Sequence, residues 1–206
     1  LKAVADSGQM VQLTDYVIAE SIRQAGVWRQ QGLRLQLGLN ISSDLVTDLE
    51  LPRRLALVLD EHGVSPGDVV IDVLEQTGPE TADLVRDVFT QLRLLGVGLC
   101  LDNFGVGSSS ITRLMNMPFT EVKVDGSLLT RVMEEPGAHR VLGCFVDLMH
   151  ALGLSVCAEG VETDAAMEHV RAAGFDAAQG LVIGAVSTAV QIARSLRSAD
   201  VARAAG

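Results

Sequence analysis

Short apolar runs alternate along the chain with stretches in which apolar residues recur every three to four positions. The first such stretch places Val17, Ile18, Ile22 and Ala25 on one face, which predicts an amphipathic helix with Thr14 as its N-cap. Several of the other predicted helices begin at a proline and end at a glycine, as is usual for helix starts and ends. The predicted helices span residues 14–32, 52–63, 79–96, 137–152, 163–174 and 188–196.

The apolar runs between these helices predict strands, which span residues 35–41, 69–73, 97–101, 121–124, 154–158 and 178–183. Most are nearly continuous in apolar residues, as expected when helices cover both faces of a parallel sheet. The repeated order of helix, glycine and strand favours an α/β fold of the TIM-type (β/α)8 barrel class. Such a barrel has eight strands and typically about 250 residues, so we expect its N-terminal strands to be missing from this chain. We expect one domain over residues 1–197 and a tail over residues 198–206.

Composition narrows the possible functions. The chain has 206 residues and a formal net charge of -10, which disfavours binding to DNA or RNA polymers because their backbones are anionic. It carries no secretory signal and no membrane segment, since no uncharged run approaches the ~20 residues of a membrane span. Cys100, Cys144 and Cys157 lie among apolar residues, so we expect buried, reduced thiols and a cytoplasmic location. The chain begins at Leu1 rather than Met, and we expect a further segment upstream.

Polar side chains mark the ends of the predicted strands. They are Asn40, Asp72, Glu75, Asp102, Asn103, Lys123, Asp125, Glu159 and Glu162, with Gln179 near the start of the last strand. The carboxyl ends of parallel strands meet at one edge of a barrel, so these groups should converge. Carboxylate and amide oxygens suit Mg²⁺ or Mn²⁺, and a lysine beside such a site can orient a water for phosphodiester hydrolysis. Any single aspartate here can equally cap a helix or fix a loop.

Two other kinds of site are disfavoured. The glycine-rich run that begins at Phe104 lacks the Gly-Lys-Ser/Thr ending of a phosphate-binding P-loop. The histidines share no ligand spacing and the cysteines form no CxxC pair, so a zinc site is not expected.

Six motifs, in order and spacing, resemble the EAL domain. They are Leu39-Asn40-Ile41-Ser42, Asp72-Val73-Leu74-Glu75, Asp102-Asn103-Phe104-Gly105, Lys123-Val124-Asp125, Ala158-Glu159-Gly160-Val161-Glu162 and Gln179-Gly180. EAL domains are bacterial cyclic-di-GMP phosphodiesterases built on a modified (β/α)8 barrel. The resemblance extends from Leu1 to about Ile192.

The resemblance implies roles for these residues. Asn40, Asp72 and Asp102 occupy the positions that hold a first metal, Mg²⁺ or Mn²⁺, and Asp102, Asn103 and Glu159 those around a second. Lys123 and Glu159 match catalytic positions, and Lys123 matches the residue that positions the attacking water. Glu75 matches the glutamate that braces the following loop. Glu162 and Gln179, with Asn103, match positions that contact the substrate.

The departures from the family pattern point to a degenerate site. The family's Glu-Ala-Leu motif lies upstream of Leu1, its Glu-Ile-Thr-Glu begins here with Asp72, and its Asp-Asp-Phe-Gly reads Asp102-Asn103-Phe104-Gly105. We therefore expect weak or absent metal binding and a role as a cyclic-di-GMP receptor or protein-interaction module. The alternative is an active cyclic-di-GMP phosphodiesterase. A protein partner and a homodimer are further expectations from the family.

Overall fold

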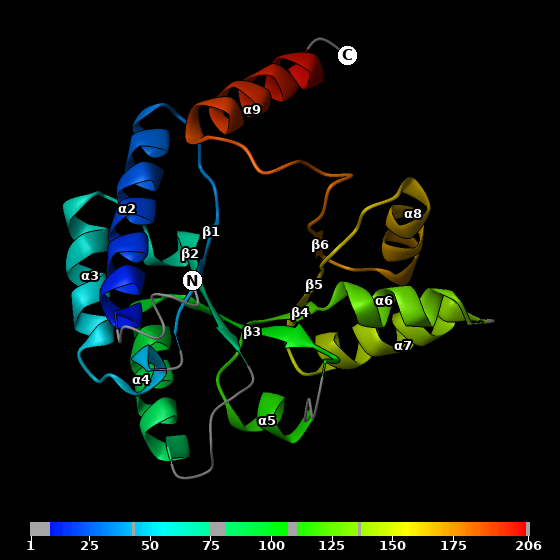
Figure 1. Ribbon diagram of the computed structural model, residues 1–206, viewed down its shortest axis with the longest axis horizontal. Coiled ribbons are helices and arrows are strands. Elements are labelled where there is room, and N and C mark those ends of the chain that lie inside the picture. Colours follow the sequence, from blue (N-terminus) through cyan, green and yellow to red (C-terminus); the bar gives the residue numbers. More distant parts are fainter. Residues whose placement is uncertain (1–8, 43, 75–80, 107–110, 136, 205–206) are drawn as a thin grey trace.

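The computed structural model describes residues 9–42, 44–74, 81–106, 111–135 and 137–204. Within these residues a single six-stranded sheet has the order β1-β2-β3-β4-β5-β6, and every neighbouring pair is parallel. The strands are β1 (Leu37–Asn40), β2 (Val69–Leu74), β3 (Gly98–Phe104), β4 (Glu121–Val124), β5 (Ser155–Ala158) and β6 (Ala177–Ala178). The sheet curves, with β1 and β6 at its two ends (Figure 1). This arrangement confirms the predicted α/β class.

Helices connect successive strands on the outside of the curve (Figure 1). The α-helices are α2 (Met10–Gln30), α3 (Leu51–Glu61), α4 (Ala82–Leu95), α5 (Ile111–Asn116), α6 (Gly126–Met133), α7 (Ala138–Ala151), α8 (Asp164–Ala173) and α9 (Ala189–Ala204). Two short 3₁₀ helices, η1 (Leu45–Thr47) and η2 (Pro66–Asp68), precede α3 and β2. None of the described helices combines the length and the apolar character needed to cross a membrane.

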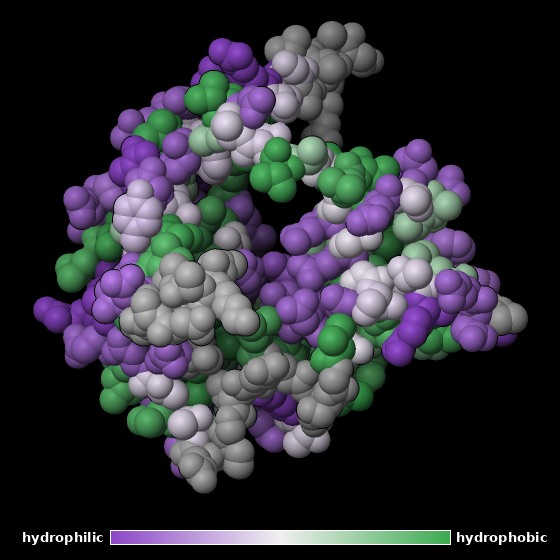
Figure 2. Space-filling model, viewed as in Figure 1, coloured by the Kyte–Doolittle hydropathy of each residue, from purple (hydrophilic) through white to green (hydrophobic). Residues whose placement is uncertain are grey.

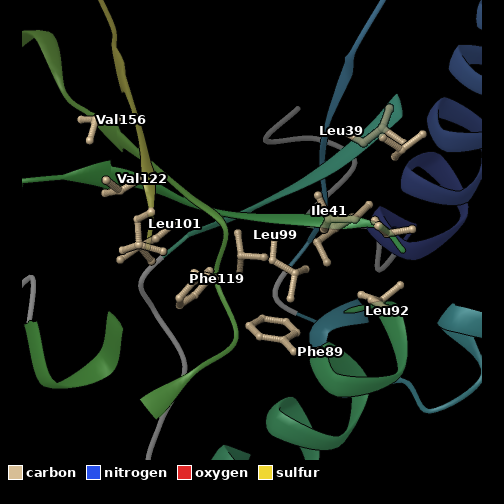
Figure 3. Packing of buried hydrophobic residues seen from close by; sticks show 14 of the residues in the cluster. Leu39, Ile41, Phe89, Leu92, Leu99, Leu101, Phe119, Val122 and Val156 are labelled. Atoms are coloured by element: carbon tan, nitrogen blue, oxygen red, sulfur yellow. The ribbon is translucent and has the colours of Figure 1, made fainter. Parts of the chain in front are cut away.

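The outer face of the sheet and the helices share one hydrophobic core. Residues that alternate along the strands, such as Leu99, Leu101 and Val122, are almost fully buried in it (Figure 3). Because successive side chains of a strand point to opposite faces, the residues between them point into the curve of the sheet. Those inward residues include Asp72, Cys100, Asp102, Glu121, Lys123 and Cys157. The alternation therefore gives the strands an apolar outer face and a partly polar inner face.

Most predicted helix ends are confirmed, but the predicted cap of the first helix is wrong. Thr163 caps α8 by accepting a hydrogen bond from the N–H of Ala166, and Gly96 and Gly174 end α4 and α8 in the left-handed conformation. Thr14 was predicted as an N-cap, but it lies inside α2 and its hydroxyl donates to the carbonyl of Met10 at 2.8 Å. Pro79, the predicted start of α4, lies outside the described residues.

Three further predictions need correction. The strand predicted over residues 178–183 ends at Ala178, because the chain then turns and Ile183 donates to the carbonyl of Gly180. Leu181 and Ile183 are consequently 64% and 52% exposed. The last helix, predicted to end at residue 196, continues to Ala204. Cys144 lies exposed on α7, whereas Cys100 and Cys157 are buried as expected.

The C-terminal helix returns to the first described helix. The indole N–H of Trp28 on α2 donates to the carbonyl of Ala189 at 3.2 Å, and Arg197 on α9 donates to Gln31 at 3.1 Å. Figure 1 shows the chain after β6 crossing toward the end of α2, where α9 begins. The space-filling view shows an opening below this helix, with polar residues gathered along part of its rim (Figure 2).

Candidate functional site

The predicted strand-end residues that the structure describes lie at the carboxyl edge of the sheet. Asn40 and Asp72 are register partners on β1 and β2, and Asp102 lies near the end of β3. Lys123 is on β4, while Glu159 and Gln179 directly follow β5 and β6. Glu75, expected to brace a loop, lies outside the described residues.

Lys123 joins two carboxylates from different strands. Its Nζ lies 2.6 Å from Oδ2 of Asp72 and 3.9 Å from Oε1 of Glu159. The side chains are largely withdrawn from water, with exposures of 13% for Lys123, 2% for Asp72 and 16% for Glu159. Burial acts to lower the pKa of Lys123, but the hydrogen bond and the charge of Asp72 outweigh it and the pKa is raised. Lys123 is therefore a buried cation at neutral pH.

Asp72 is the most deeply buried carboxylate of the site. Burial raises its pKa, and the hydrogen bond from Lys123 opposes that rise. Its second oxygen, Oδ1, is buried and has no hydrogen-bond partner among the described residues. Gly38 on the neighbouring strand leaves room for the Asp72 carboxylate, since a Cβ there would lie 3.2 Å from Oδ2. An unpaired buried oxygen is costly, so a water or a cation is the natural partner for Oδ1.

Asp102 and Asn103 form an irregularity at the end of β3. The register with β4 shifts between Leu101 and Phe104, and Asn103 has a φ of 56°. Asparagine tolerates this left-handed conformation better than most residues. The backbone N–H of Asn103 donates to Oδ1 of Asp102 at 2.9 Å, and its side-chain amide donates to Oδ2 at 3.4 Å. Both oxygens of Asp102 thus accept hydrogen bonds from the residue that follows it.

Glu159 lies between these residues and an open groove. Burial and the neighbouring Asp102 carboxylate raise its pKa to about 7, and Gln179 donates to its Oε1 at 3.1 Å. The groove has a volume of about 730 Å³ and runs along α6 beside the N-terminal end of α8. Its lining includes Asp125, Glu159, Gly160, Glu162, Thr163 and Gln179. Asp125 also caps α6, because its carboxylate accepts from the N–H of Ser127.

The predicted residues are not equally close to this centre. Asp72, Asp102, Lys123, Glu159, Asn103 and Gln179 are linked by the contacts described above. Glu162 is exposed on the groove, and Asn40 is exposed beside Asp72 with no described side-chain contact to the other groups.

One inward-facing acid had not been singled out from the sequence. Glu121 precedes Lys123 by two residues on β4, so both point to the same side of the sheet. It is half-buried, and burial raises its pKa. The alternation Glu121-Val122-Lys123-Val124, polar in every second position, was the signal that could have revealed it.

The metal centre implied by the family pattern does not fit the side chains as they lie. Across the described part of the chain, no three His, Cys, Asp or Glu residues come together in a group that could hold a metal ion. N–H donors of the chain itself already engage Asp102, Glu159 and one oxygen of Asp72. Among the described residues, the buried Oδ1 of Asp72 accepts no hydrogen bond and remains open to a cation.

Comparison with known proteins gives the same family as the motifs. The family model described as the EAL domain matches residues 1–185. The bifunctional diguanylate cyclase/cyclic di-GMP phosphodiesterase MucR of Pseudomonas aeruginosa is 29% identical over 191 residues, which are 92% of this chain and 28% of that protein. The cyclic di-GMP phosphodiesterase RocR of the same species is 31% identical over 152 residues, 73% of this chain and 38% of RocR. The chain thus spans well under half the length of these curated relatives.

Solved structures share the fold. A MucR phosphodiesterase in complex with c-di-GMP superimposes with a TM-score of 0.83 at 28% identity, covering 93% of this chain and 78% of that one. The EAL domain of Mycobacterium smegmatis DcpA gives a TM-score of 0.83 at 25% identity, with 91% and 84% covered. Klebsiella pneumoniae BlrP1 with manganese and cyclic di-GMP gives 0.74 at 26% identity, with 84% and 44% covered. Motifs, fold and family model agree, and the chain belongs to the EAL domain family.

Proposed function

We propose that this EAL domain binds cyclic di-GMP at the carboxyl edge of its sheet and hydrolyses it slowly or not at all. It then serves as a receptor or a protein-interaction module, and a protein partner or a second copy of the domain binds its ligand-bound form. Two kinds of observation support ligand binding: membership of the EAL family, and relatives whose structures are complexes with c-di-GMP. The groove beside Glu159 supplies space at the position where the family motifs converge.

The contact between Asn103 and Asp102 carries the proposal of a degenerate site. The family motif has a second aspartate where this chain has Asn103, so the position contributes an amide instead of a negative charge. That amide donates to Oδ2 of Asp102, an oxygen that a metal ion would need as a ligand. An N–H donor and a cation compete for the same lone pairs, and hard divalent cations prefer anionic oxygens.

A titration with cyclic di-GMP tests binding, and product analysis tests hydrolysis. We expect isothermal titration calorimetry to detect one bound ligand per chain, and chromatography to show no linear dinucleotide product on the timescale of a normal turnover. Product formation at ~1 per second or faster with Mg²⁺ or Mn²⁺, an ordinary enzyme rate, contradicts the degenerate site. Asp147→Asn, on the exposed face of α7, is the control for nonspecific charge effects.

One observation favours the alternative of an active phosphodiesterase. Asp72, Asp102, Lys123 and Glu159 all remain, and they lie together at one edge of the sheet. If the enzyme is active, Lys123→Met should abolish turnover while the ligand still binds. A variant that loses binding and turnover together would indicate a structural role for Lys123 instead.

A further inference from the structure

The carboxylates at the carboxyl edge are held together by a positive charge that belongs to the chain. Asp72 and Glu159 project from different parts of the sheet, and Nζ of Lys123 lies 2.6 Å from one and 3.9 Å from the other. Without a cation, acidic groups gathered in a poorly hydrated place repel one another strongly. Lys123 supplies that cation from within the protein.

The strand geometry explains why the lysine reaches Asp72. The two residues lie on β2 and β4, two strand spacings apart, or roughly 9.6 Å across the intervening β3. Cys100, a small residue, is the register partner of Asp72 on the intervening strand β3. The short aspartate side chain stays close to the sheet, and the long lysine side chain crosses to meet it.

This arrangement also disfavours a divalent ion at Oδ1 of Asp72. Oδ1 of Asp72 belongs to the same carboxylate that binds the ammonium through Oδ2. A doubly charged ion on Oδ1 would lie within a few ångströms of the Lys123 charge, and the repulsion is large where water is excluded. In the family pattern a second aspartate follows Asp102 and adds a negative charge that offsets this repulsion, but Asn103 is neutral. In this chain Lys123 and a metal ion are therefore competitors for Asp72.

We infer that Lys123 is the built-in cation of this site and replaces the divalent metals that the family pattern implies. The site is then assembled without metal and, given the proposed function, binds cyclic di-GMP without metal. The ammonium also presents donors toward the edge where the anionic phosphodiester would lie.

The stability of the ligand-free protein tests the first half of this inference. We expect the melting temperature of the unaltered protein to be the same, within about 1 °C, in EDTA and in 1 mM Mn²⁺. Lys123→Met should lower it by about 10 °C in EDTA, because one partner of a buried ion pair is left alone. Mn²⁺ should then restore at least half of that loss, because the metal takes the vacated place beside Asp72.

Two further variants keep this test decisive. Arg131→Met removes an exposed cation on α6. The melting temperature of this variant should be the same in EDTA and in Mn²⁺. Lys123→Met combined with Asp72→Asn removes both charges, and should be more stable than Lys123→Met alone and indifferent to Mn²⁺. The inference is overturned if Mn²⁺ raises the melting temperature of the unaltered protein by several degrees. It is also overturned if Lys123→Met is not destabilised in EDTA or is not restabilised by Mn²⁺. If Lys123→Met does not fold, the double variant decides, and a response of its melting temperature to Mn²⁺ overturns the inference.

Calorimetry with cyclic di-GMP tests the second half. We expect the Kd in EDTA and in Mn²⁺ to agree within threefold, whereas a tenfold or greater loss in EDTA overturns metal-independent binding. Absence of binding in both buffers contradicts the proposed function itself. In that case the melting temperatures of the ligand-free variants still decide whether Lys123 is the cation of the site.

Discussion

Gly126 and Gly160 meet backbone to backbone beside Glu159. A Cβ on Gly126 would come within 3.0 Å of the carbonyl oxygen of Glu159 and 3.1 Å of the Cα of Gly160. Gly126 begins α6, and Gly160 follows Glu159 after β5, so this contact joins two of the loops that border the groove. The close approach fixes the backbone from which the Glu159 side chain projects.

Replacing Gly160 with alanine should loosen this contact. Gly160 has a φ of 66°, and its Cβ would lie 3.1 Å from the Cα of Gly126. We expect Gly160→Ala to lower the free energy of unfolding by about 1–2 kcal/mol, the usual cost of a left-handed conformation for a residue with a Cβ. Urea denaturation measures the change.

Gly143 provides the matched control. It lies within α7, and a Cβ there meets nothing within 4 Å. Gly143→Ala should raise the free energy of unfolding by about 0.4–1 kcal/mol, because alanine has less conformational freedom in the unfolded chain. Equal effects of the two substitutions would show that the contact with Gly126 does not matter.

Asn103→Asp should make the protein more dependent on divalent metal. The new carboxylate would lie where the amide now donates to Oδ2 of Asp102, and two like charges at that distance repel. We expect a loss of about 1 kcal/mol in stability in EDTA and a tenfold or greater gain in Mn²⁺ affinity, measured by calorimetry. Asn103→Gly keeps the left-handed backbone without adding charge, so it should gain no affinity for Mn²⁺. Equal Mn²⁺ affinity of all three proteins would contradict the explanation.

The exposed thiol on α7 should be the reactive one. Cys144 is exposed, while Cys100 and Cys157 are buried and burial raises the pKa of both, to about 12 for Cys157. Because the thiolate is the nucleophile, a disulfide reagent such as DTNB should modify one thiol of the folded protein quickly and all three only after unfolding. Cys144→Ser should remove the fast phase. A fast phase that persists in this variant would mean that the inner face of the sheet opens readily.

The sequence predicted the positions of the first five strands well because alternation and glycine positions are local signals. It predicted that Asp72, Asp102 and Lys123 would converge, since parallel strands share a carboxyl edge, and the structure places them there. It did not predict which groups would bond. The lysine reaches across β3 to Asp72 past Cys100, the register partner of Asp72, and this depends on the register between strands.

The errors have physical causes of the same kind. Leu181, Val182 and Ile183 form an apolar run that is typical of a buried strand, yet β6 is the last strand of the described sheet and the chain turns at Gly180. Thr14 has the side chain of a helix cap, but the helix begins one turn earlier and the hydroxyl bonds back to Met10. In both cases tertiary context decided between two structures that the local sequence allows.

Asp176 should make part of the stability depend on pH. Its carboxylate accepts from the backbone N–H of Val156 at 2.7 Å and contacts Nε2 of His150 at 2.8 Å, which ties the start of β6 to α7 and β5. Burial acts to raise the pKa of Asp176, but these two hydrogen bonds outweigh it and the pKa is lowered. A lowered pKa means that the stabilisation is fully present above the pKa of an unfolded aspartate, about 3.9, and is lost as the pH falls through the lower value of the folded state.

We expect Asp176→Asn to be about 1 kcal/mol less stable than the unaltered protein at pH 7, with the difference shrinking as the pH is lowered below 4. Urea denaturation across this range, with Asp147→Asn on the exposed face of α7 as the control, measures it; a difference that stays constant down to pH 3 would show that the ionised carboxylate is not what stabilises this contact.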